Sequence, residues 1–231
     1  MRVLLTGANR GLGLEWVRQL AARGERVFAT CRQPAQATAL QEVAREFADR
    51  VVVLPMDVSA PESIATAVQQ VAQQTAALDV VINNAGVLFE HETIANLQAQ
   101  HLETACRVNA IGPLMVAQQA LPLLRRGHRP VVFNISTMLA SLTLKDFGGY
   151  YSYSASKAAL NMLTRTLAAE LRPQGIIVVA VHPGWVRTEM GGPAAPLSPE
   201  TSVRGMLQLL DGLTLAHSGR FWTWEGREHP W

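Results

Sequence analysis

The sequence contains few groups that could form disulfides or bind metals. Only two cysteines, Cys31 and Cys106, occur among its 231 residues. Two thiols in a chain that shows no export signal are better interpreted as reduced residues than as a bridge. The six histidines are scattered, and neither an H-E-x-x-H nor a C-x-x-C spacing occurs. The sequence therefore predicts no metal site.

Long apolar runs and an excess of one charge are also missing. The apolar runs are only a few residues long, as at 176–181, whereas a helix needs ~20 apolar residues to cross a bilayer. No signal peptide precedes the first apolar run, which follows Met1 directly. Twenty Lys and Arg against 18 Asp and Glu give a formal charge of +2, too even for a nucleic-acid surface. We expect a cytoplasmic protein with neither membrane nor nucleic acid as a partner.

The chain alternates short apolar runs with helical patterns. With 48% hydrophobic residues it can bury one large core, and no linker or repeat divides it. Apolar runs flanked by helical segments indicate a parallel sheet covered on both faces. We predict a single α/β domain over 1–231, a doubly wound Rossmann fold with about seven strands. The expected strands are 2–6, 26–30, 51–54, 80–82, 131–135 and 176–181, and the expected helices are 14–21, 35–47, 63–75, 97–124 with a break at Gly112 and Pro113, 153–171 and 199–210.

A glycine-rich turn at 6–13 follows the first apolar run. Gly7, Gly11 and Gly13 let the backbone turn sharply and approach a pyrophosphate, whose charge then lies at a helix N-terminus. The spacing T-G-x-x-x-G-x-G differs from the common G-x-G-x-x-G dinucleotide motif. The turn indicates a nucleotide-binding site near the start of the chain.

A phenol and an ammonium group lie four residues apart, at Tyr153 and Lys157. On a helix this spacing puts both side chains on one face. A phenol with a pKa near 10 is a poor acid at neutral pH, but a fixed cation beside it favours the phenolate and lowers that pKa. The pattern alone is loose, because an ordinary helical Tyr and Lys would show it as well.

Further landmarks follow along the chain. They are Asp57-Val58, Asn83-Asn84-Ala85-Gly86, Asn109 and Pro183-Gly184. Together with the glycine turn and the Y-x-x-x-K pattern, they resemble the short-chain dehydrogenase/reductase family over 4–188. The stretches 182–192 and 148–153 and the final Pro230-Trp231 are most similar to the C-factor and sniffer-type carbonyl reductase branch.

The resemblance implies a dinucleotide site. Its residues would be Gly7, Asn9, Arg10, Gly11, Leu12, Gly13, Arg32, Asp57, Val58, Asn83, Ala85, Gly86, Tyr153, Lys157, Pro183, Gly184, Val186 and Thr188. In NAD-binding relatives an acid near the end of the second strand holds the ribose hydroxyls. Here Arg32 stands in that segment and, with Arg10, offers a guanidinium to a 2′-phosphate. NADP is therefore the predicted cofactor, and the alternative is that either arginine is merely solvated.

The resemblance also implies a catalytic segment at 134–157 and a role for Asn109. Tyr153 would donate a proton to the developing alkoxide, while Lys157 would assist it and hold the nicotinamide ribose. Asn109 would support a water relay to Lys157; the alternative is a polar residue that caps the break near Gly112.

Thr137 departs from the family pattern. The hydroxyl that steadies the substrate oxygen is usually the second serine of an Asn-x-Ser-Ser run, and Thr137 occupies that place here. Its hydroxyl has the same hydrogen-bonding capacity, and its methyl group stiffens the side chain. Ser136 and Ser141 are the alternatives, although Ser136 should point to the opposite side of the strand if the extended geometry continues.

Glycines and prolines at 191–199 preclude regular structure. By analogy with the family, 188–203 would be a lid over the substrate; the alternative is a surface connection.

The family often pairs subunits through its two long helices. Both helices carry small and apolar residues here, which predicts a homo-oligomer (dimer or tetramer), with a monomer as the alternative.

The predicted function is NADPH-dependent reduction of a small carbonyl substrate, a ketone or an aldehyde. One alternative is a cofactor-binding signalling or regulatory protein of C-factor type with little turnover. The complete set of polar catalytic groups favours the enzyme, because a binding module has no need for them. A sugar-nucleotide epimerase or dehydratase shares Y-x-x-x-K but needs a larger substrate domain than the segment after Trp185 provides.

Overall fold

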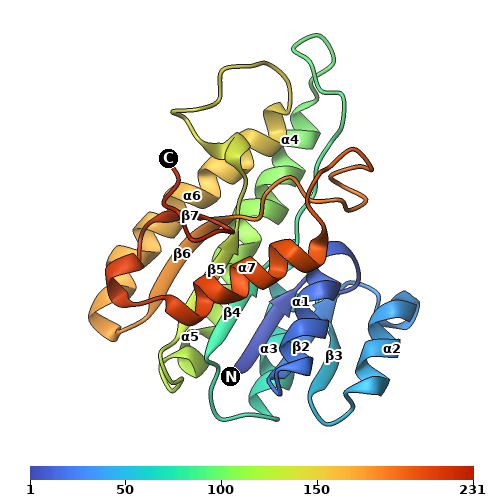
Figure 1. The fold of residues 1–231 in the computed structure, drawn as a ribbon, viewed down its shortest axis with the longest axis vertical. Helices are drawn as coiled ribbons and strands as arrows, with labels where there is room; N and C mark the ends of the chain where they lie inside the picture. The colour runs from blue at the N-terminus through green and yellow to red at the C-terminus, as the bar shows by residue number, and fades with distance from the viewer.

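The computed structural model describes residues 1–231 as one seven-stranded parallel sheet (Figure 1). The strand order is β3-β2-β1-β4-β5-β6-β7, and every pairing between neighbouring strands is parallel. The strands are β1 (Arg2–Thr6), β2 (Arg26–Cys31), β3 (Val51–Pro55), β4 (Val80–Asn83), β5 (Val131–Ile135), β6 (Ile177–His182) and β7 (Phe221–Thr223). The predicted doubly wound fold is confirmed.

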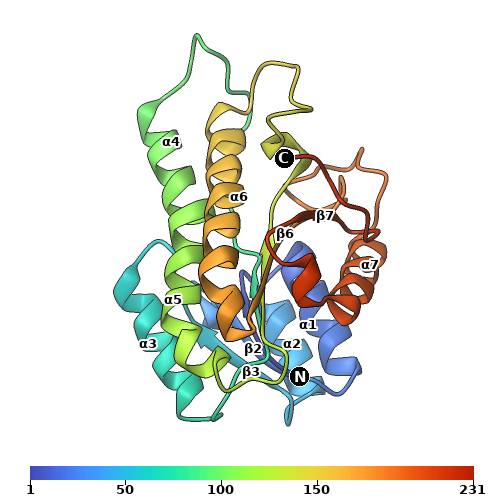
Figure 2. The ribbon, with the colours of Figure 1, turned by 90° about the vertical axis from the view of Figure 1, so that its left-hand side faces the viewer.

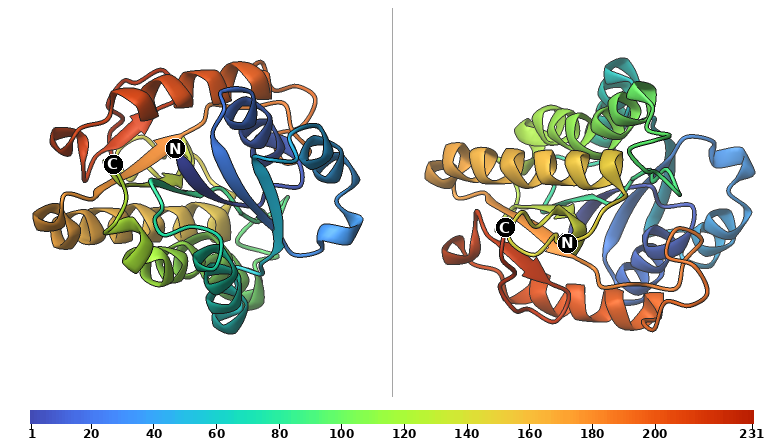
Figure 3. Two further views of the ribbon diagram at one scale, coloured as in Figure 1. Left: turned by 90° about the horizontal axis from the view of Figure 1, so that it is seen from below. Right: turned by 90° about the horizontal axis from the view of Figure 1, so that it is seen from above.

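Helices cover both faces of the sheet (Figures 2 and 3). One layer contains α1, α2 and α7, and the other contains α3, α5 and α6, with α4 continuing the line of α5. The helices are α1 (Gly11–Ala22), α2 (Thr38–Glu46), α3 (Pro61–Ala72), α4 (Ala99–Cys106), α5 (Gly112–Leu124), α6 (Tyr151–Leu171) and α7 (Pro199–Gly212).

One hydrophobic core lies on each side of the sheet. Successive strand residues point to opposite faces, so Val3 and Leu5 of β1 belong to the core under α1, α2 and α7, whereas Leu4 belongs to the other. Trp16 of α1 meets Phe133 of β5 edge to face, with ring centroids 5.7 Å apart. Because both faces are buried, the strands are mostly apolar, the pattern that predicts a parallel sheet.

The predicted helix at 97–124 is interrupted earlier than expected. A π turn at Arg107–Ile111 joins α4 to α5, and Gly112 opens α5. A Cβ at Gly112 would lie 2.6 Å from the carbonyl oxygen of Val58, so the glycine permits close packing against the loop after β3. The seventh strand, β7, spans three residues, too few for the sequence pattern to reveal it.

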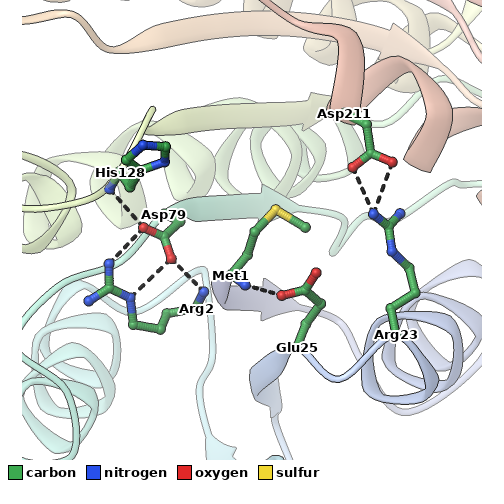
Figure 4. Close-up of polar contacts among 7 residues, drawn as sticks. All are labelled: Met1, Arg2, Arg23, Glu25, Asp79, His128 and Asp211. Atoms are coloured by element: carbon green, nitrogen blue, oxygen red, sulfur yellow. Dashed lines mark hydrogen bonds and ion pairs between the residues drawn. The ribbon is translucent and has the colours of Figure 1, made fainter.

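Ion pairs close the amino end of the sheet (Figure 4). Arg2 donates from Nε and Nη2 to the Asp79 carboxylate at 3.0 and 2.7 Å, and the backbone N–H groups of Arg2 and His128 add two more bonds at 2.7 and 2.8 Å. Although burial opposes it, these donors lower the pKa of Asp79 to about 2. Arg23 joins the end of α1 to Asp211 of α7 at 2.8 and 2.9 Å. The cleft lies at the opposite end of the sheet, where the strands have their carboxyl ends.

The prediction of subunit pairing rests on small and apolar residues in and next to α5 and α6, namely Ala110, Leu114, Ala117, Ala158, Ala159 and Met162, and only some of these are exposed. Met162 is 64% exposed, whereas Ala110 in the π turn and Ala117 are buried inside the subunit. None of the helices is long and apolar enough to span a membrane.

Candidate active site

A cleft of about 1310 Å³ runs along the carboxyl ends of the strands. It lies where the strand order reverses between β1 and β4, so that the following helices leave in opposite directions and open a crevice. The cleft is larger than most small-molecule sites, a size suited to a dinucleotide together with a substrate. Every predicted site residue except Asn83 and Asn109 lines it.

The glycine turn forms one end of this cleft. Gly7 has φ of 68°, and a Cβ at Gly13 would lie 1.9 Å from the carbonyl oxygen of Gly7. Asn84 fixes the turn by donating from Nδ2 to the carbonyl oxygens of Thr6 and Gly7, both at 3.0 Å. Helix α1 starts here without a side-chain cap and without an acid in its first turn. Its N-terminal N–H groups therefore suit a pyrophosphate.

Arg32 lies beside Asp57 at the end of β2. Burial raises the pKa of Asp57, but hydrogen bonds from Ser59 outweigh it and the charge of Arg32 adds to them, so the net shift is downward. Arg10 instead forms an ion pair with Glu189, in the segment that follows β6. Arg32 makes no hydrogen bond and has its guanidinium free for an anion.

Tyr153 and Lys157 lie near each other in the cleft, but their electrostatics differ from the expectation. Burial raises the pKa of Tyr153 to about 12, against a hydrogen bond with Thr137 that lowers it. The Lys157 ammonium donates to the carbonyl oxygen of Ile135 at 2.6 Å, and burial lowers its pKa to about 8. The expectation that Lys157 lowers the pKa of Tyr153 is wrong for this structure, because burial outweighs any such effect.

Thr137 and Ser136 have different hydrogen-bond partners at the end of β5. Ser136 donates to Oδ1 of Asn161 on α6 at 2.7 Å. Thr137 begins the 3₁₀ turn Met138–Ala140, where its Oγ1 accepts from the N–H of Leu139 at 3.3 Å. Its hydroxyl also reaches the phenol of Tyr153. The pair Thr137 and Tyr153 can therefore hold one oxygen atom between them.

Asn83 and Asn109 are both buried away from the cleft surface. Asn83 donates to Oδ1 of Asn134 at 2.8 Å and joins β4 to β5. Asn109 exchanges hydrogen bonds with the backbone N–H and carbonyl of Val87 and donates to Ser156 at 3.0 Å. It therefore binds a loop and α6 and does not cap the break near Gly112.

The segment predicted as a lid begins as turns and ends as a helix. Its last five residues, 199–203, belong to α7, and the irregular part is 188–198. Thr188 Oγ1 accepts from the N–H of Gly191 at 3.1 Å, and Trp185 donates from Nε1 to the Gly191 carbonyl at 2.8 Å. The ion pair between Arg10 and Glu189 ties this segment to the glycine turn across the cleft.

The fold and this cleft define a class of protein. The chain belongs to the short-chain dehydrogenase family, whose model matches residues 1–196. It is 45% identical to the C-signal of Myxococcus xanthus over 157 residues, covering 68% of this chain and 95% of the relative. The resemblance to the C-factor and sniffer-type branch is confirmed by this match and by the structures below.

Two solved carbonyl reductases superpose on the whole of this chain. The NADPH-bound enzyme from chicken fatty liver is 38% identical with a TM-score of 0.94, covering 100% of this chain and 98% of that one. Carbonyl reductase Sniffer of Drosophila melanogaster is 33% identical with a TM-score of 0.95, covering 100% and 99%. The chain is thus an oxidoreductase by family.

Proposed function

We propose that the protein reduces small ketones or aldehydes to alcohols with NADPH, in the cytoplasm. The proposal rests on one observation: Thr137, Tyr153 and Lys157 all line the cleft that begins at the glycine turn. The NADPH-bound state of the chicken carbonyl reductase supports the cofactor assignment. Pairing of subunits through α5 and α6 remains a prediction.

Each protein group has a task in this reaction. NADPH supplies the hydride when bound. Tyr153 keeps its proton at neutral pH, because its pKa of about 12 lies far above that range, and is therefore in the form that can protonate the substrate oxygen. Thr137 orients that oxygen, and Lys157 provides a cation close to the developing charge. The rim is apolar, with Met138, Phe147 and Trp185 partly exposed along the cleft.

The experiment that tests this proposal is a screen of ketones and aldehydes with purified protein, in which the loss of NADPH absorbance is followed. Sustained turnover of at least one carbonyl compound is expected. NADPH binding without turnover of any compound would favour the second candidate, a signalling protein that binds the cofactor. The 45% identity to the C-signal of Myxococcus xanthus is the observation that keeps this candidate.

Replacing Arg32 with aspartate is expected to weaken NADPH binding by one to two decades and to leave NADH binding nearly unchanged. The reason is that a charge-assisted hydrogen bond contributes roughly 1.5–3 kcal/mol, and only NADPH carries the 2′-phosphate. Dissociation constants for both cofactors, measured on the parent and Arg32→Asp proteins, test this. Arg204→Asp, an exposed change on α7 outside the cleft, is the control. Equal affinity of the parent for both cofactors would refute the assignment.

A further inference from the structure

Helix α6 begins without a cap of its own, although it carries Tyr153 and Lys157. The residue before it, Tyr150, lies in the left-handed region with φ of 56° and makes no side-chain cap. The first turn contains no acidic residue. The first N–H groups of a helix have no partner within the helix and need one from elsewhere. Tyr153 is the third residue of α6 and lies within this turn.

The missing partner comes from Glu92, in the loop after β4. One carboxylate oxygen, Oε2, accepts from the backbone N–H of Ser152 at 2.9 Å, and the other, Oε1, accepts from the Ser152 hydroxyl at 2.8 Å. The Glu92 side chain is 2% exposed and Ser152 is fully buried. A buried carboxylate at a helix N-terminus is favoured by the helix dipole as well as by these bonds.

The surroundings of Glu92 hold it in this position. Nδ1 of His101 on α4 lies 3.5 Å from Oε1, and the His101 ring stacks on Phe89 with centroids 4.0 Å apart. Asn96 closes the loop by accepting from the N–H of Thr93 at 2.7 Å and donating to the carbonyl of His91 at 3.0 Å. The carboxylate therefore joins the loop, α4 and α6 at one buried point.

We propose that Glu92 is a positioning residue for Tyr153, capping the catalytic helix from a distant loop and thereby fixing where the phenol lies. The proposal rests on the proposed function, because it concerns the acid of that reaction. Without the cap the first turn of α6 frays, and a displacement of about 1 Å at a reacting group can lower a rate by about 10²-fold. Lys157, one turn further, stays inside the hydrogen-bonded helix, so cofactor binding is spared.

The test compares Glu92→Leu with the parent in steady-state kinetics, NADPH binding and hydrogen exchange. In Glu92→Leu we expect kcat to fall about ten- to hundredfold, with the dissociation constant of NADPH within about twofold of the parent. Exchange of the amides at 151–154 is expected to rise roughly five- to thirtyfold, as for the loss of a helix cap. Glu103→Leu, an exposed change on α4, is the matched control and should leave all three unchanged.

Glu92→Gln separates positioning from a merely structural role. Its amide oxygen can still accept from the N–H of Ser152, and its amide nitrogen can donate to the hydroxyl, so kcat should recover to within about threefold of the parent. If Glu92 had only a structural role, Glu92→Leu would lower the melting temperature but leave kcat unchanged at temperatures where the protein is folded. A Glu92→Leu protein with the parent kcat, or with parent exchange at 151–154, would overturn the proposal.

Two further arms keep the test decisive. If Glu92→Leu does not fold, Ser152→Ala, which removes one of the two bonds, should lower kcat about threefold and speed exchange in the same segment; parent values for both would refute the inference. If the parent reduces no carbonyl compound, the proposed function fails, whereas the exchange measurement still decides whether Glu92 fixes the turn that carries Tyr153.

Discussion

Replacing Tyr153 with phenylalanine is expected to abolish carbonyl reduction and to leave NADPH binding nearly intact. The change removes the proton donor but keeps the ring that fills the cleft. Because burial holds the pKa of the phenol at about 12, parent activity should not fall through deprotonation of Tyr153 as the pH rises through the neutral range. Oxidation of the alcohol product needs the deprotonated phenol and should rise with pH. Initial rates in both directions, together with a cofactor dissociation constant, test this expectation.

The neighbouring Tyr151→Phe protein is the control for this substitution. Tyr151 is 37% exposed in the same turn of α6 and does not line the cleft. It should retain parent activity. A Tyr153→Phe protein that reduces its best substrate within tenfold of the parent rate would show that another group is the acid.

Replacing Thr137 with valine is expected to lower kcat by about 10²–10³, the typical loss for one hydrogen bond to a developing oxyanion. Valine keeps the branched shape and removes the hydroxyl that reaches Tyr153. Thr137→Ser should remain active, because serine retains the donor. Turnover numbers of the three proteins at saturating NADPH and substrate provide the comparison.

Ser136→Ala is the matched control, because it removes the adjacent hydroxyl. The Ser136 hydroxyl already donates its proton to Oδ1 of Asn161 at 2.7 Å, so it is not free to donate to a substrate oxygen and its loss should be mild for turnover. The reverse ranking, with Ser136→Ala severe and Thr137→Val near the parent rate, would transfer the role to Ser136.

The sequence predicts the parts of this protein that depend on local pattern. Strands buried on both faces are mostly apolar, and Gly7 and Gly13 stand where a Cβ would collide with backbone, so both leave a clear signal. The relation between Tyr153 and Lys157 is likewise set by one helix. The predicted site residues line the cleft except Asn83 and Asn109, because a position in the family motif does not show which way a side chain turns.

What the sequence could not predict depends on contacts between distant segments. Glu92 lies in an irregular loop, 60 residues before the serine it caps, and nothing near it in the chain marks the pairing. The ion pair between Arg10 and Glu189 joins residues 179 apart. The pKa of Tyr153 follows from burial by the whole fold, which a Y-x-x-x-K spacing does not reveal. The resemblance to the family implies roles for residues, but the contacts of Glu92, the ion pair of Arg10 and the pKa of Tyr153 depend on how the whole chain packs.

The buried ammonium of Lys157 has a thermodynamic consequence for the free protein. Burial lowers its pKa from 10.5 to about 8, so between these values the unfolded chain binds more protons than the native one. The free energy of unfolding therefore increases as the pH rises through this window, and the penalty is fully present below about pH 8. At about 1.4 kcal/mol for each pKa unit, the penalty is on the order of 3 kcal/mol. We therefore predict that an apolar side chain at position 157 would raise the free energy of unfolding below about pH 8, while removing the cation proposed for the reaction.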